Sequence, residues 1–271
     1  MKLIDCFMYF DEDLLLDVRL HTLDKIVDKF VISESTKDHA GNNNKLKFNI
    51  NNFSKYKNKI RYIVEDNLPK EVGYFKKNWS PDWIRENMHR NSLSNGYKDF
   101  NDEDVIMISD LDEIPNPNEI KKYDENKKYA CFIQKNFQAK LNLLNTTDSD
   151  WAGTKITKKK YLQSPQWLRN LKTKERPFWK FYKPRQPQII LNGGWHFSYL
   201  KNSSGISKKI QSFAHQEYNK EEFINLQKIE ERLKKNIDIF GRNYNYKKIS
   251  IDETFPDYIY KNQDKFKNWI A

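Results

Sequence analysis

The stretch DVIMISDLDEIP, residues 104–115, is the segment that decides the predicted fold. Residues 105–108 form an apolar run followed by acidic and turn residues, which indicates a buried strand that ends at Asp110. In open parallel sheets, ligands bind just beyond the carboxyl ends of the strands. The carboxylates of Asp110, Asp112 and Glu113 therefore lie where a binding site is expected.

Asp110 and Asp112 are separated by one residue. In an extended segment such residues point to the same side, so the two carboxylates would face one point. Because bare carboxylates so close together repel each other, the pair indicates a divalent cation, and Mn²⁺ or Mg²⁺ would also bind phosphate oxygens. Such a metal can stabilise the charge on a nucleoside diphosphate leaving group. The alternative interpretation is a solvated turn after the strand.

Segments N-terminal to this strand predict a parallel sheet. Strands are expected at residues 2–9, 29–34 and 60–64, and a helix at residues 11–23 separates the first two. A strand, a helix and a strand at this spacing are typical of a right-handed βαβ unit. Another helix is predicted at residues 81–93, and it opens with a proline.

The C-terminal half is predicted to contain loops, short strands and two helices. Further strands are expected at residues 129–132, 137–144 and 188–191. Most of residues 151–191 is expected to form loops and the acceptor side of a site. A helix is predicted at residues 221–240 because its apolar residues would share one face, namely Phe223, Leu226, Leu233, Ile237 and Phe240. A last helix is predicted at residues 257–270.

The composition favours one folded domain and excludes wholesale disorder. The chain has 271 residues, of which 38% are hydrophobic and 14% aromatic, enough for a sizeable core. Cys6 and Cys131 lie in apolar stretches, which predicts buried free thiols rather than a disulfide framework. The N-terminus lacks the features of a signal peptide, and no uncharged apolar run approaches about 18 residues, so we expect a soluble cytoplasmic protein without a membrane anchor.

The net charge of +11 leaves two interpretations open. Lysines are scattered along the chain with only short runs, which favours a solvated surface without a specific partner. Contact with a nucleotide or with peripheral anionic surfaces is the alternative. A nucleic-acid-binding protein is not expected, because no binding motif accompanies the charge.

A second candidate for the metal site lies at the end of the glycine turn in residues 192–197. Gly193 and Gly194 allow the backbone to turn tightly before His196. A neutral imidazole could complete the coordination of the metal or touch the diphosphate. The alternative is a packed histidine in an aromatic core.

Arg85 and Arg90 lie on the helix predicted before the acidic strand. One arginine could pair with a diphosphate or brace Asp110. The alternative is an ordinary surface arginine, with Arg90 paired to Glu86 four residues earlier.

Seven stretches, in this order, resemble glycosyltransferase family 17. They extend from the start of the chain to about residue 215 and comprise residues 10–15, 19–20, 27–34, 85–90, 109–115, 193–198 and 210–217. The resemblance implies a Rossmann-like GT-A fold of the α/β class, with a mostly parallel central sheet flanked by helices. It predicts a catalytic domain at residues 1–204 and a helical C-terminal extension at residues 205–271 packed on the same domain.

The resemblance also implies an inverting, metal-dependent transfer of a sugar to a glycan hydroxyl, with UDP-GlcNAc as the favoured nucleotide-sugar donor. The ligands that it implies for Mn²⁺ or Mg²⁺ are Asp110, Asp112 and His196. The residues expected to bind the donor are Glu34, Arg85, Arg90, Asp110 and Asp112.

An inverting transfer requires a general base that deprotonates the acceptor hydroxyl. The candidates near the acceptor side are Asp148, Asp150 and Glu175, each of which could also be an ordinary loop carboxylate. Asp150 is favoured because Trp151 beside it could offer an aromatic face to a sugar.

Two other functions are compatible with these residues. A nucleotidyltransferase also uses paired acidic residues and a metal, but it would release pyrophosphate rather than a nucleoside diphosphate. A non-catalytic glycan-binding or nucleotide-binding protein would not hydrolyse a donor in the presence of Mn²⁺. The intact set of Asp110, Asp112 and His196 favours the glycosyltransferase over the binding protein.

Overall fold

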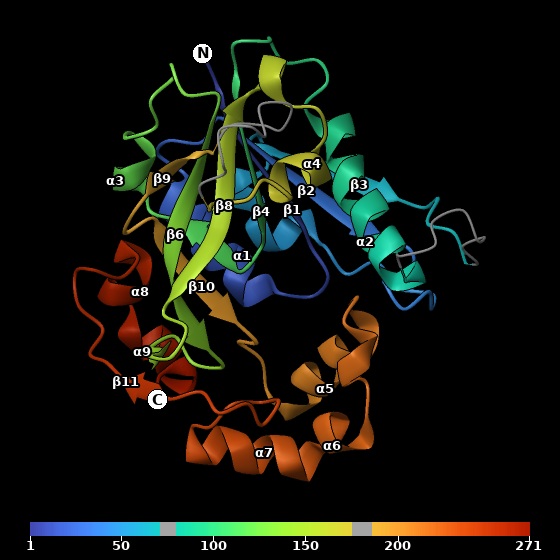
Figure 1. Cartoon of the computed structure of the whole chain (residues 1–271), viewed down its shortest axis with the longest axis vertical. Coiled ribbons are helices and arrows are strands. Elements are labelled where there is room, and N and C mark those ends of the chain that lie inside the picture. Colours follow the sequence, from blue (N-terminus) through green and yellow to red (C-terminus); the bar gives the residue numbers. More distant parts are fainter. Residues whose placement is uncertain (71–79, 175–185) are drawn as a thin grey trace.

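A curled mixed β-sheet forms the centre of the computed structural model, which describes residues 1–70, 80–174 and 186–271 (Figure 1). Its strands are β1 Leu3–Met8, β2 Lys29–Ser35, β3 Ile60–Glu65, β4 Val105–Asp110, β5 Glu113–Pro115, β6 Tyr129–Gln138, β7 Leu143–Asn145, β8 Asp150–Lys158, β9 Gln188–Ile190, β10 Gly194–Ser198 and β11 Tyr246–Lys248. They follow the order β11-β7-β6-β8-β4-β1-β2-β3, while β9 and β10 pair with β6, and β5 pairs with β10. The predicted α/β class is confirmed.

The predicted βαβ unit forms one half of the sheet. β1 pairs in parallel with both β2 and β4, and β3 pairs in parallel with β2. Helix α1, Asp13–Leu23, connects β1 to β2 as predicted. The central strand β4 ends at Asp110, so the acidic residues follow the carboxyl end of a buried strand as expected.

The other half of the sheet is mostly antiparallel, although β9 and β10 each pair in parallel with β6, so the expectation of a mostly parallel sheet is wrong. β8 lies antiparallel between β4 and β6, and β7 is antiparallel to both β6 and β11. The chain passes from β6 to β7 and from β7 to β8 through short connections. Such connections suit antiparallel neighbours, whereas parallel neighbours need a crossover of a dozen or more residues.

β6 is one continuous strand rather than the two predicted at residues 129–132 and 137–144, and β8 occupies a segment predicted mainly as loops. Buried polar residues explain the first departure. Gln134 is fully buried in β6 and Asn136 is 7% exposed, and both bond to side chains of other strands. Polar residues in that position interrupt the apolar pattern from which a strand is predicted.

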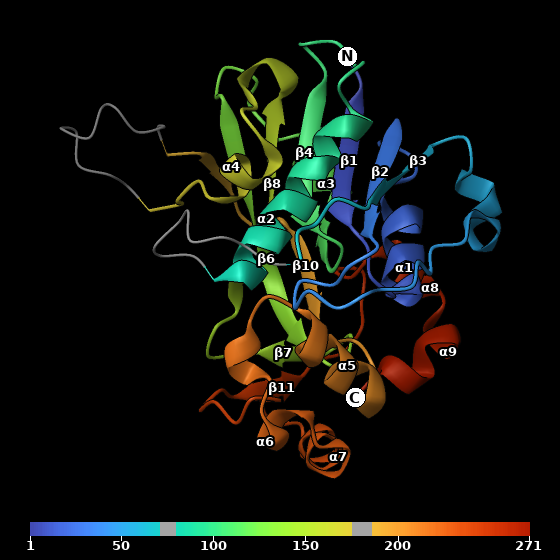
Figure 2. The same ribbon diagram turned by 90° about the vertical axis from the view of Figure 1, so that its right-hand side faces the viewer.

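Two apolar cores cover the two faces of the sheet, because successive side chains of a strand point to opposite sides. Phe7 and Met107 belong to the core that includes residues of α1, α8 (Asp257–Lys261) and α9 (Gln263–Phe266). Cys6 and Ile106 belong to the core on the other face, which also contains Leu168 of α4 (Pro165–Arg169). Figure 2 shows α2, Pro81–Ser92, and α4 on the opposite side of the sheet from α1 and α8.

The remaining helices are short. The α-helices are α3 Pro117–Ile120, α5 Ser203–Ser212, α6 Glu221–Ile224 and α7 Leu226–Lys235, and the 3₁₀ helices are η1 Ile50–Tyr56, η2 Leu93–Gly96, η3 Lys159–Tyr161, η4 Gln216–Tyr218 and η5 Lys267–Trp269. Helices α5, α6 and α7 gather at one end of the molecule around a third, smaller core (Figure 1). Within the described ranges, no helix combines the length and the apolarity needed to cross a membrane.

The long helix predicted at residues 221–240 is wrong, because two asparagines divide and end it. Asn225 separates α6 from α7 and caps α7 by accepting a hydrogen bond from the amide of Lys228. Asn236 then ends α7 in the left-handed conformation, at φ 53°. The predicted apolar face is wrong in part: Phe223, Leu233 and Phe240 pack in the third core, but Leu226 and Ile237 are each 47% exposed. The last predicted helix, residues 257–270, is likewise divided into α8, α9 and η5.

Replacing Gly194 with Ala should lower the free energy of unfolding by about 2–3 kcal/mol. Gly194 adopts φ +131°, and a Cβ atom there would lie 2.1 Å from the carbonyl oxygen of Ile114 in the neighbouring strand β5. Urea denaturation followed by circular dichroism measures the loss. Gly241→Ala is the matched control, because its φ is +68° but a Cβ atom would meet only the Arg232 guanidinium, at 3.8 Å. Equal losses in the two variants would show that the contact with β5 is unimportant.

Candidate active site

A cavity of about 310 Å³ lies beyond the carboxyl ends of β1, β2 and β4, where a ligand site was predicted. Four of the predicted site residues line it, namely Arg90, Asp110, Asp112 and His196. They come from α2, from the last residue of β4 and the turn after it, and from β10. The structure therefore brings together residues that are far apart in the sequence.

Arg19 of α1 fixes the turn that carries the two aspartates. Its side chain is fully buried and donates to the carbonyl oxygens of Asp110, Leu111 and Glu113 at 3.1, 3.2 and 2.8 Å. Its other nitrogens donate to the carboxylate of the fully buried Asp5, at 2.8 and 2.7 Å. A carbonyl without a partner is costly in a dry interior, so this one guanidinium stabilises the path of the turn.

The expectation that Asp110 and Asp112 lie in one extended segment is wrong. β4 ends at Asp110, Leu111 and Asp112 form a turn, and β5 begins at Glu113. The turn gives the two carboxylates different partners. Asp110 lies 3.0 Å from Arg90 and 3.2 Å from Arg169, whereas Asp112 lies 3.3 Å from Lys209 and 3.9 Å from the Nε2 atom of His196.

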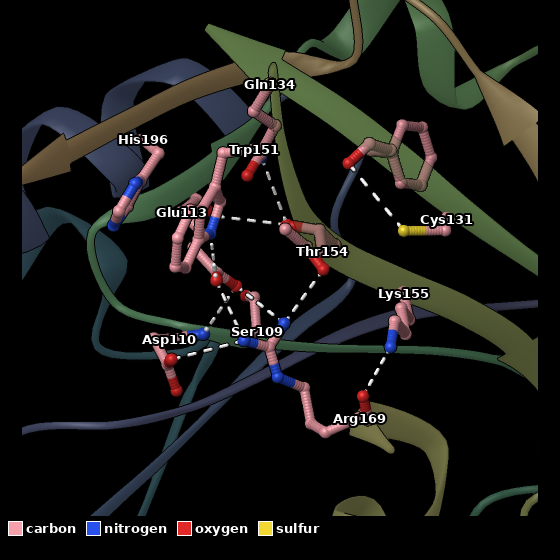
Figure 3. A network of polar contacts seen from close by, with 12 residues as sticks. Ser109, Asp110, Glu113, Cys131, Gln134, Trp151, Thr154, Lys155, Arg169 and His196 are labelled. Atoms are coloured by element: carbon pink, nitrogen blue, oxygen red, sulfur yellow. Dashed lines mark hydrogen bonds and ion pairs between the residues drawn. The ribbon is translucent and has the colours of Figure 1, made fainter. Parts of the chain in front are cut away.

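The partly exposed Asp110 belongs to an ion-pair network with the buried Glu113 and with Arg169 (Figure 3). Arg169 donates to both carboxylate oxygens of Glu113, at 2.7 and 2.8 Å, and Glu113 also accepts from the amide of Asp110 and the indole of Trp151. Burial opposes ionisation of Asp110, but the charges of Arg90 and Arg169 outweigh it and hold the pKa of this carboxyl well below its usual range. Asp110 is therefore ionised in the folded protein.

The tautomer of His196 follows from its hydrogen-bond partners. The amide nitrogen of Asn136 donates to the carbonyl of Asp148 at 3.0 Å, so the oxygen of this amide faces the imidazole. That oxygen lies 3.1 Å from Nδ1 of His196, which must then carry the proton. In a neutral imidazole of this tautomer the lone pair lies on Nε2, the nitrogen that is 3.9 Å from Asp112. His196 is packed against Trp151, with ring centroids 4.3 Å apart, yet one nitrogen remains able to bind a metal (Figure 3).

Lys209 of α5 supplies a cation to the same wall of the cavity. Its ammonium lies 3.3 Å from Asp112 and 3.5 Å from Glu12, a carboxylate at the start of α1. Burial lowers the pKa of Lys209, but the carboxylates of Asp112 and Glu12 outweigh this effect and raise it above its usual range. The lysine is therefore charged at neutral pH.

Two neutral histidines line the cavity next to Arg90. His39 follows β2 and His89 lies on α2, and their ring nitrogens are 3.2 Å apart. The pKa of each is lowered to about 3, mainly by burial and in addition by Arg90 beside His39 and by the other ring beside His89. Both rings are uncharged at neutral pH, so they add hydrogen-bonding groups but no positive charge.

Three of the predicted site residues do not line the cavity. Glu34 is fully buried and accepts hydrogen bonds from the amides of Lys47 and Phe48 and from the hydroxyl of Tyr62, at 2.8, 3.1 and 2.9 Å. Arg85 is 3% exposed and donates to the carbonyl of His39 at 2.6 Å. Their roles in donor binding stay predictions.

The third is Asp150, which lies exposed at the start of β8, next to Trp151 in the cavity wall. Asp148 lies nearby and contributes its backbone carbonyl to the support of His196 through Asn136. Glu175, another candidate base, lies outside the described residues. The identity of the base stays a prediction.

For Arg90 the structure supports two of the interpretations considered. It braces Asp110 at 3.0 Å, and it also pairs with Glu86 at 2.6 Å. Sequence reasoning missed Arg169 and Lys209. No sequence signal distinguishes Arg169 within an aromatic-rich segment, and Lys209 is one of many scattered lysines.

Asp112 and His196 fit a divalent metal that also binds a substrate. Among residues 1–70, 80–174 and 186–271, no three His, Cys, Asp or Glu side chains are grouped closely enough to hold a metal ion by themselves. The Oδ1 atom of Asp112 and the Nε2 atom of His196 nevertheless lie 3.9 Å apart and face the same space. Mg²⁺ and Mn²⁺ are commonly held by one or two side chains and completed by water and phosphate oxygens.

Comparisons with known proteins also indicate a glycosyltransferase. The model of glycosyltransferase family 17 matches residues 1–269. The chain is similar to the beta-1,4-mannosyl-glycoprotein 4-beta-N-acetylglucosaminyltransferases of Rattus norvegicus and Homo sapiens, with 27% identity over 221 residues in each case. A Mus musculus protein of the same name is 33% identical over 106 residues, which are 37% of this chain and 19% of that protein. The two longer matches cover 73% of this chain but only 40% of each relative.

Proposed function

The chain belongs to glycosyltransferase family 17, and from this premise we propose that it transfers a sugar from a nucleotide-sugar donor to a hydroxyl group of a glycan. The resemblance in the sequence thus led to the correct family. The observation that carries the proposal is the meeting of Asp112, His196 and Arg90 in one cavity at the carboxyl ends of the parallel strands. The relatives' names describe N-acetylglucosaminyltransferases, so UDP-GlcNAc is the donor that we propose.

A divalent metal, Mn²⁺ or Mg²⁺, is proposed to bind between Asp112 and His196. When bound, it would stabilise the charge that develops on the diphosphate leaving group. Asn136 would hold the Nδ1 proton of His196 and so keep the Nε2 lone pair directed at the metal. The role of Asp110 as a further ligand remains a prediction, because a metal would have to compete there with two arginines.

The acceptor would lie on the side of the cavity formed by Trp151. This ring is held in place by the hydrogen bond from its indole nitrogen to Glu113 and by stacking on His196. We propose Asp150, next to it in β8, as the base that removes the proton of the acceptor hydroxyl in an inverting reaction. The proposal includes a GT-A type organisation, in which the parallel strands β4, β1, β2 and β3 form the nucleotide-binding half.

Mn²⁺ and UDP together should raise the melting temperature by about 5–10 °C, more than the sum of their separate effects. Asp112 and His196 are the two described side chains that we propose as metal ligands, so the metal and the nucleotide should each bind tightly only when the other completes the coordination. A thermal-shift titration with Mn²⁺, UDP, UDP-GlcNAc and other nucleotide sugars measures this coupling.

Three outcomes separate the rival functions. Release of UDP from UDP-GlcNAc in the presence of Mn²⁺ would support the glycosyltransferase. Release of pyrophosphate from a nucleoside triphosphate would indicate a nucleotidyltransferase instead. Binding without any turnover would indicate a binding protein, and no shift with any nucleotide would contradict the proposed site.

A further inference from the structure

Lys209 lies between two carboxylates of the cavity wall that come from different parts of the chain. Its ammonium is 3.3 Å from Oδ2 of Asp112 and 3.5 Å from Oε1 of Glu12. The three side chains are 21%, 13% and 10% exposed, so water screens them little. The ammonium is thus the counter-ion of the carboxylate to which the metal is proposed to bind.

A divalent cation and this ammonium would compete for the same group. Asp112 has two oxygens, of which one faces His196 and the other faces Lys209. A metal bound between Asp112 and His196 would place two further positive charges close to the ammonium and weaken its hold on the carboxylate. An ammonium released from Asp112 needs another anionic partner in the cavity. The diphosphate that accompanies the metal provides one.

We propose that Lys209 is an exchangeable counter-ion, which neutralises Asp112 and Glu12 before the donor binds and then binds the diphosphate of the donor. This inference rests on the proposed function and deepens it, because it assigns a donor-binding residue outside the acidic motif. Lys209 would therefore lower the affinity for the metal in the absence of nucleotide and raise it in the presence of nucleotide.

The surroundings of Lys209 allow the side chain to move while the helix stays fixed. Ile206 and Ile210 of α5 are fully buried in the smaller core. The carbonyl of Ser212, at the end of α5, accepts a hydrogen bond from the amide of His39 at 3.0 Å, which ties the helix to the loop after β2. Lysine carries its ammonium on four flexible methylene groups, so a short movement of the head needs no movement of α5.

Lys209→Met should change two affinities in opposite directions. Methionine keeps an unbranched side chain but has no charge, so the competitor of the metal is lost together with a ligand of the diphosphate. We expect the affinity for Mn²⁺ without nucleotide to rise about 10-fold, and the affinity for UDP in saturating Mn²⁺ to fall about 10-fold. The free Mn²⁺ signal in electron paramagnetic resonance gives the first affinity, and isothermal titration calorimetry with UDP gives the second.

Two further variants make the test specific. Lys209→Arg keeps the positive charge and should retain UDP affinity within about threefold of wild type, since guanidinium groups also bind phosphate well. Lys234→Met makes the same change on the exposed side of α7 and should leave both affinities unchanged. Similar melting temperatures would show that the variants are folded.

The possible failures are distinguishable. If Lys209→Met lowers both affinities, or changes neither, the exchange of partners is wrong while the proposed metal site survives. If wild-type protein binds neither Mn²⁺ nor UDP, the proposed function is wrong and the inference is overturned with it.

Discussion

Replacing Asp112 with Asn should reduce sugar transfer by about 100- to 1000-fold, as expected when one group that stabilises a leaving-group charge is lost. Asparagine has the same shape but a neutral amide, so it is a poor ligand for Mn²⁺ or Mg²⁺. The loss should appear in metal-dependent UDP binding as well as in turnover. The fold should survive, because the hydrogen bond that ties this residue to Phe197 uses its backbone carbonyl.

The measurements are UDP affinity by calorimetry with and without Mn²⁺, and UDP release from UDP-GlcNAc. Asp99→Asn is the matched control, since it removes an exposed carboxylate that pairs with Arg61 away from the cavity. That variant should keep its activity. Unchanged UDP affinity of Asp112→Asn in the presence of Mn²⁺ would contradict the assignment of this aspartate to the metal site.

The acidic end of the site, which we propose binds the donor, could be predicted because its signals are local. Residues 104–115 contain a buried strand and its acidic end in one continuous stretch, and the location of this end beside the carboxyl ends of β1 and β2 follows from the parallel pairing. The same reasoning failed for the conformation of the turn. The alternation of side chains applies only to extended backbone, and the carbonyls of the turn are held by Arg19, which lies more than 90 residues earlier.

The remaining parts of the site depend on contacts between distant residues, which sequence patterns cannot identify as partners. Asn136 and Gln134 are buried polar residues whose partners lie on β10 and β8, so the continuous strand β6 was not predictable from apolar periodicity. Arg169 reaches Glu113 and Asp110 from a helix of five residues. Lys209 reaches Asp112 only because α5 packs beside the end of the sheet. In each case the pairing is created by the tertiary fold.

Replacing Arg19 with Met should lower the free energy of unfolding by about 3–5 kcal/mol, the usual cost of removing one partner of a buried ion pair. Both Arg19 and Asp5 are fully buried, so the variant would leave the carboxylate of Asp5 without a counter-charge. Urea denaturation measures the loss. Arg61→Met is the control, because Arg61 forms a partly exposed pair with Asp99, and its loss should cost at most about 1 kcal/mol.

A double variant, Asp5→Asn with Arg19→Met, separates the two roles of Arg19. If the charge pair alone mattered, removing both charges would restore most of the stability. The carbonyls of Asp110, Leu111 and Glu113 would still lack their donor, however, so we expect the double variant to remain about 2–3 kcal/mol less stable than wild type. It should also bind UDP and Mn²⁺ more weakly, since the turn that positions Asp112 is no longer held. Wild-type stability and affinity in the double variant would show that the turn keeps its shape without Arg19.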